Sequence, residues 1–139
     1  METTSLYNIL EKENIQYVNH SLKNSNGMIT HYEDITAIIV DENQTPTTAS
    51  TNTVLIQELG HFKTGSYYKT NSPIELIDKM EYKADKKSWE MFFPYRKIVK
   101  LMKKGYTTVT QLAEYFDVEP NYMARCVNYY YNQYNGFEH

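Results

Sequence analysis

The chain has 139 residues, 41% of them hydrophobic, which is enough for one compact domain with a real core. Its net charge of −3 gives no overall basic field, and this argues against a nucleic-acid-binding protein. The single cysteine, Cys126, excludes an internal disulfide and is expected to be a buried thiol. Since no apolar run could cross a bilayer and the first residues do not resemble a signal peptide, we expect a cytoplasmic protein without membrane contact.

The amino-terminal third predicts one helix followed by three short strands. Apolar residues at helical spacing place the helix at 5–14. Alternating or apolar runs separated by turn-like polar segments place the strands at 15–20, 27–31 and 35–40. A polar loop over 41–53 then leads into a second helix, whose candidate N-caps are Thr51, Asn52 and Thr53.

The remainder of the chain predicts four further helices. The first starts at Pro73 and ends before Pro94, with Trp89, Phe92 and Phe93 expected in the core. Others are expected at 95–104, at 109–116 and from Pro120 to about 134. The fold class is therefore α+β, a small antiparallel sheet packed on the central helix. Residues 1–94 form the expected core, and residues 95–139 form a helical extension packed on it.

The central helix carries Gln57, Glu58 and His61, a pattern that differs by one residue from the His-Glu-x-x-His signature of zinc peptidases. Residues 57 and 61 project from the same side of a helix, and Glu58 is offset by about 100°, where it could reach a water molecule. Leu55, Leu59 and Phe62 form an apolar stripe on the opposite side. Gly60 is unfavourable within a helix, which suggests that another backbone approaches closely there.

A catalytic zinc site needs three protein ligands and an open position. Glu81, early in the following helical segment, is the best candidate for a further ligand. Asp85 is on the same face one turn later. It could orient a ligand or substitute at the degenerate position of Gln57.

Taken together, Gln57-Glu58-Leu59-Gly60-His61, Thr64-Gly65, Glu81-Tyr82-Lys83-Ala84-Asp85 and Pro94 resemble the ImmA/IrrE family of small zinc endopeptidases, especially those of phages and mobile elements. The resemblance continues over 105–118, which is similar to the family's carboxy-terminal helical segment. It implies a zincin-like motif helix, Zn²⁺ held by His61 and Glu81, and Glu58 as general base. It also implies a bacterial host cell and a repressor as the protein acted upon.

Gln57 replaces an imidazole by a neutral amide, which is a weak zinc donor. Asp85, an additional water, His20 or His31 could fill the vacant position. Three interpretations therefore remain open: a zinc peptidase or anti-repressor, a variant with an altered metal site, and an inactive peptidase fold that regulates a protein partner by binding.

Tyrosines are the candidate substrate-binding or partner-binding residues. Tyr67 and Tyr68 are next to the motif in sequence and could line a cleft or polarise a carbonyl. Tyr130 and Tyr131 belong to a cluster that wraps around the last helix, so part of it is expected to meet a partner. The last three helices also have the rhythm of a helix-turn-helix, but only Arg125 on the last one is basic. Direct DNA binding is therefore the least favoured interpretation.

Overall fold

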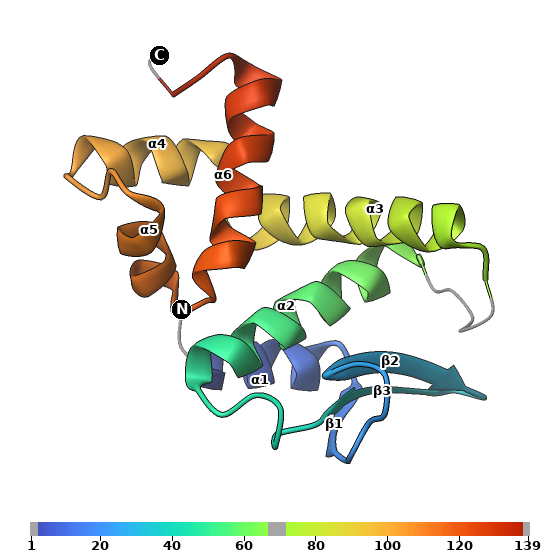
Figure 1. Cartoon of the computed structure of the whole chain (residues 1–139). Coiled ribbons are helices and arrows are strands. Elements are labelled where there is room, and N and C mark those ends of the chain that lie inside the picture. Colours follow the sequence, from blue (N-terminus) through green and yellow to red (C-terminus); the bar gives the residue numbers. More distant parts are fainter. Residues whose placement is uncertain (1–2, 67–71, 138–139) are drawn as a thin grey trace.

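The computed structural model describes residues 3–66 and 72–137. It contains three strands and six helices in these ranges (Figure 1), and the α+β class is confirmed. The elements are α1 Thr3–Lys12, β1 Ile15–Asn19, β2 Gly27–Tyr32, β3 Ile35–Val40, α2 Thr48–Thr64, α3 Ile74–Phe92, α4 Tyr95–Lys103, α5 Val109–Phe116 and α6 Pro120–Tyr134. No helix within these ranges is both long and apolar enough to span a membrane.

The sheet is mixed, which corrects the expectation that it is wholly antiparallel. Its strand order is β1-β3-β2, with β2 antiparallel to β3 and β1 parallel to β3. The connection over 20–26 carries the chain past the position of β3 to the far edge of the sheet, where β2 lies. A tight turn at 33–34 then leads from β2 into the central strand β3. Ile38 and Val40 of the central strand are fully buried beneath α2, whereas Ile35 is exposed.

Helix α2 begins earlier than its sequence predicts. Thr47 is the N-cap, and its side chain accepts a hydrogen bond from the backbone N–H of Ser50, whose side chain accepts one from the backbone N–H of Thr47 in return. This reciprocal cap satisfies two amide groups that the start of a helix leaves unpaired. Asn52 and Thr53 are therefore not caps but buried residues inside the helix.

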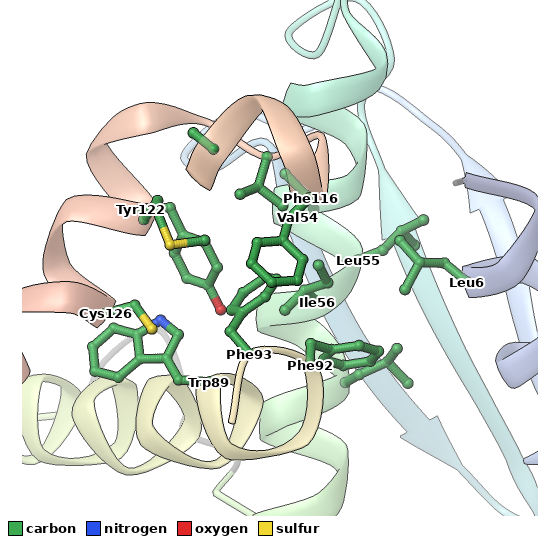
Figure 2. Close-up of a cluster of buried hydrophobic side chains, with 14 of the residues drawn as sticks. Leu6, Val54, Leu55, Ile56, Trp89, Phe92, Phe93, Phe116, Tyr122 and Cys126 are labelled. Atoms are coloured by element: carbon green, nitrogen blue, oxygen red, sulfur yellow. The ribbon is translucent and has the colours of Figure 1, made fainter. Parts of the chain in front are cut away.

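The helical half is joined to α2 by polar contacts and by a shared core. The Asn52 amide donates to the Asp117 carbonyl at 2.9 Å, and the Glu119 N–H donates to the Thr53 hydroxyl at 2.9 Å. Figure 2 shows Tyr122, Cys126 and Phe116 beside side chains of α2 and α3, with Cys126 buried as expected. The turn between α5 and α6 is thus fixed against the amino-terminal part of α2.

Helices α2 and α3 approach closely at Gly60, as its unfavourable helix propensity predicts. A Cβ atom built on Gly60 would lie 2.3 Å from the carbonyl oxygen of Ala84. A Cβ atom does not approach a non-bonded oxygen so closely in folded proteins, so any side chain at residue 60 would force the two helix backbones apart. This contact brings the motif face of α2 next to α3.

The first prediction follows from this contact. Gly60→Ala is expected to lower the free energy of unfolding by about 3 kcal/mol, because backbone must move to relieve the overlap. Urea denaturation followed by circular dichroism measures the change. Gly27→Ala is the matched comparison, since its Cβ would overlap the Val54 side chain at 2.2 Å. Val54→Ala should therefore partly rescue Gly27→Ala but not Gly60→Ala. A Gly60→Ala protein as stable as the parent would contradict the helix packing.

Candidate functional site

The structure brings together His61 from the last turns of α2 and Glu81 from α3. Nε2 of His61 lies 3.1 Å from Oε1 of Glu81, although the residues are twenty positions apart in the chain. Leu55 and Leu59 are fully buried on the opposite side of α2, as the apolar stripe predicts. The close packing at Gly60, one residue before His61, is what places these two side chains within reach.

His61 is buried and its ring orientation is fixed. Gly65 has a left-handed backbone (φ 64°) that ends α2 and turns the chain back, so that the Ser66 carbonyl lies 2.7 Å from Nδ1 of His61. Because a carbonyl oxygen can only accept, Nδ1 carries a hydrogen and donates it. Nε2 is therefore the nitrogen directed at Glu81. Metal-binding histidines in proteins are commonly oriented by this kind of contact.

The charges around His61 favour its protonated form. Burial lowers the pKa of His61, but the hydrogen bond to Glu81 and the negative charges of Glu58 and Glu81 outweigh it and raise the pKa to about 9. Without a metal, His61 and Glu81 thus form an ion pair at neutral pH. The pair gives the buried imidazolium of His61 a partner, without which burying its charge would be costly, while Glu81 is partly exposed.

Glu58 is the third ionisable group of the site. Burial raises its pKa to about 7, an effect that the charge of His61 partly opposes and that of Glu81 reinforces. A carboxyl group with a pKa near neutrality can both accept and return a proton at physiological pH. Glu58 therefore has the acid–base property that a general base needs.

Asp85 faces Arg125 of α6, an arrangement that the sequence did not suggest. Its side chain is buried and accepts a hydrogen bond from the Arg125 guanidinium. Burial raises the pKa of Asp85, while Arg125 opposes this shift. Because the Asp85 carboxylate already has a cationic partner, this geometry favours a positioning role over the role of substitute metal ligand.

The residues provide part of a zinc site. His61 presents an oriented nitrogen and Glu81 an adjacent carboxylate oxygen, which fit two positions of a tetrahedral site. The remaining position of the motif holds the amide of Gln57. In the described ranges, no three His, Cys, Asp or Glu side chains form a group able to hold a metal ion. The fit is thus restricted to two strong donors.

The other candidates are dispersed. Nδ1 of His20 lies 2.9 Å from the carbonyl oxygen of Ser21, and Nδ1 of His31 lies 2.7 Å from the hydroxyl oxygen of Thr36 on the neighbouring strand. Tyr67 and Tyr68 lie outside the described residues. Tyr130 is only 2% exposed, so its expected contact with a partner is corrected to a core position, whereas Tyr131 is 58% exposed.

A second prediction uses the two raised pKa values. Between about pH 5 and pH 9 the folded state binds more protons than the unfolded state, because the folded pKa values of Glu58 and His61 are both above their ordinary values. The stability that these two groups contribute is therefore fully present at low pH and is lost as the pH rises toward 9. In the presence of a chelator, the free energy of unfolding of the metal-free chain should decrease by roughly 2–3 kcal/mol between about pH 6 and pH 9.

Chemical denaturation at each pH measures this loss, and Glu81→Gln is the informative variant. It keeps the shape but removes the charge that raises the pKa of His61, so the loss should fall to less than half. An unfolding free energy that stays level or increases toward pH 9 would show that His61 and Glu81 are not paired.

The site thus consists of an oriented imidazole, two carboxylates with linked charges, and an amide at the position of the missing histidine. Such a group can bind a divalent metal weakly or hold a polar segment of another protein. Comparisons of the chain with protein-family models, curated proteins and solved structures find no match.

Proposed function

We propose that this chain is a metallopeptidase-type protein of the ImmA/IrrE kind that acts on a bacterial or phage regulatory protein, in particular a helix-turn-helix repressor. The observation that supports this proposal is the approach of Glu81 to His61, with Glu58 coupled to both by charge. These are the residues to which the resemblance gives the roles of ligands and base. They come from two helices and meet at one place.

In the hydrolytic form of this proposal, His61 and Glu81 would hold Zn²⁺ and Gln57 would contribute a weak third donor. When bound, the metal would supply Lewis-acid activation of water and of the scissile carbonyl. Glu58 accepts the proton that the attacking water loses, which suits its pKa near 7. Asp85 is fixed by Arg125 and interacts by charge with Glu81 and His61, so it would act by positioning.

The alternative is regulation of the same protein partner by binding alone. It is favoured by the observation that His61 and Glu81 satisfy each other's charge without a metal. Because residue 57 is an amide, the site lacks the imidazole that would help a metal ion to displace this ion pair. In this form the site is a recognition surface, and hydrolysis plays no part.

Direct DNA binding is the weakest of the three proposals. Arg125, the basic residue of α6, is already paired with Asp85. The turn before α6 is tied to α2 through Asn52 and Thr53, which is unfavourable for inserting the start of α6 into a DNA groove.

Salt dependence separates a protein partner from DNA. We expect no tight binding of the isolated chain to duplex DNA, and only a shallow decrease of partner binding as salt rises. Fluorescence anisotropy with a labelled duplex and with a purified repressor measures both. Tight duplex binding whose affinity falls steeply with salt would move the DNA-binding interpretation to first place.

The cellular test is a repressor-controlled reporter in a bacterium expressing the chain, with immunodetection of the repressor. If the chain hydrolyses its partner, Glu58→Gln and His61→Ala should each abolish derepression and repressor cleavage while the fold remains intact. If it acts by binding, derepression should persist in Glu58→Gln with the repressor uncut. Derepression that is equal in the parent and both variants would contradict any role for this site.

A further inference from the structure

Helices α3 and α6 form a groove next to the site. Its volume is about 320 Å³, which is in the range of small ligand-binding pockets and leaves room for one or two side chains. One wall and the floor are aromatic, and the other wall is polar. Its lining includes Tyr82, Trp89, Arg125, Asn128, Tyr129 and Asn132.

Arg125 is held rigidly on one side of this groove. Its guanidinium donates to Asp85, and its Cζ atom lies 5.7 Å from the centre of the Trp89 ring. The side chain is still 51% exposed, and within the described ranges its other N–H groups have no hydrogen-bond partner. A guanidinium held by an ion pair and close to an aromatic ring loses little freedom on binding, and its remaining donors fit a carboxylate.

The same face of α6 that carries Arg125 also offers groups that recognise a peptide main chain. Asn128 and Asn132 are exposed on α6, one helical turn apart. A helix rises about 6 Å over four residues, and an extended peptide advances about 6.7 Å over two. The two amides can therefore bond alternate residues of one extended strand. An amide side chain suits this task because it both donates and accepts.

The aromatic part of the groove can hold an apolar side chain. The Tyr82 and Tyr129 rings are 6.2 Å apart and nearly perpendicular, and Trp89 lies 5.5 Å from Tyr129. Tyr82 is half exposed, and Lys86 lies over its ring at 4.6 Å, adding positive charge at the mouth. Glu90 acts electrostatically on Tyr129. Two basic side chains, Lys86 and Arg125, thus each lie against an aromatic ring of the groove.

The groove and the proposed site share helix α3. Tyr82 directly follows Glu81, and Asp85 links the two places, because it bonds Arg125 and also interacts by charge with Glu81 and His61. A peptide lying in the groove would therefore lead toward the pair of His61 and Glu81.

We propose that the α3–α6 groove binds an extended segment of the protein partner, with an Asp or Glu side chain on Arg125 and an apolar side chain among Tyr82, Trp89 and Tyr129. This inference rests on the proposed function for the existence of a protein partner. It adds the chemical character of the segment recognised: acidic and apolar residues close together in an extended stretch.

The probe is a phage-displayed library of random dodecapeptides, panned on the full chain in the presence of chelator. We expect enrichment of peptides with an Asp or Glu within two residues of an aromatic or aliphatic residue. Trp89 is the only tryptophan of the chain, so titration of its fluorescence with the selected peptides reports binding at the groove. Replacing the acidic residue of a selected peptide by its amide should weaken binding about tenfold.

Two Asn→Asp variants provide the matched test. Asn128→Asp places a carboxylate in the groove one helical turn from Arg125, whereas Asn8→Asp makes the same charge change at an exposed position of α1. The first should weaken binding of the acidic peptides at least about tenfold, and the second should leave it within about twofold. Selection of peptides without acidic residues, or equal effects of the two variants, would overturn the proposal.

The outcome is independent of the proposed chemistry because no metal is present. His61→Ala should leave peptide affinity within about twofold of the parent if the groove is a separate subsite. Loss of peptide binding in His61→Ala with normal folding would assign the peptides to the His61 site instead and overturn the groove proposal. Failure of the groove test would leave the reporter and cleavage tests of the proposed function unaffected.

Discussion

Gln57→His should convert a weak metal site into a strong one. An imidazole at residue 57 would complete the three-ligand set with His61 and Glu81, because residues 57 and 61 project from the same side of α2. Residues that only hydrogen-bond to a metal ligand change metal affinity by about 10–100-fold. A side chain that binds the metal directly should contribute more, so we expect zinc affinity to rise at least about a hundredfold. Metal analysis after dialysis should change from substoichiometric zinc to about one zinc per chain.

Gln16→His is the control for this substitution, since it adds an imidazole at an exposed position of β1. It should leave the zinc content unchanged. Tight stoichiometric zinc in the unaltered protein would show that the ligands are misidentified. The absence of any gain in Gln57→His, with the fold intact, would show that residue 57 does not point toward His61 and Glu81.

Glu58→Gln should remove nearly all hydrolysis, if the chain is a peptidase, without removing partner binding. The substitution keeps the shape of the side chain but cannot accept a proton, and general bases typically contribute 10²–10⁴-fold to the rate. We expect a decrease of about a thousandfold in kcat with little change in partner affinity. Quantified cleavage of the purified repressor, together with its binding measured by anisotropy, separates the two effects.

Glu11→Gln is the matched control, because it makes the same change at an exposed position of α1. It should leave the cleavage rate within about twofold. Cleavage that continues at the parental rate in Glu58→Gln would remove Glu58 from the chemistry.

Most helices and strands could be predicted from local sequence. The bounds of α5, α6 and β3 follow from caps, prolines and apolar spacing, which are properties of neighbouring residues. The parallel pairing of β1 with β3 could not be predicted, because strand order depends on how a connection crosses the sheet. The sequence predicts a start of α2 that is several residues too late, because Thr and Ser favour caps and loops unless tertiary contacts bury them.

The sequence predicts which residues of the candidate site share a helix face, but not how the two helices meet. The meeting of His61 with Glu81 requires the close contact at Gly60, which the glycine itself indicated. Ser66 could not be found, since it contributes a backbone carbonyl and any residue supplies one. Arg125 gave one signal, as the only base on an otherwise uncharged last helix, but nothing in the sequence connected it to Asp85 across forty residues.

Calorimetric titration of zinc into the metal-free chain is the most direct test of whether His61 and Glu81 form one site. We expect weak binding of one zinc per chain, with an affinity that decreases at least about tenfold in both His61→Ala and Glu81→Ala. His31→Ala, which removes an imidazole from β2, should bind zinc like the parent. Zinc binding that is unchanged in both site variants, or that is lost in His31→Ala, would contradict the assignment of His61 and Glu81.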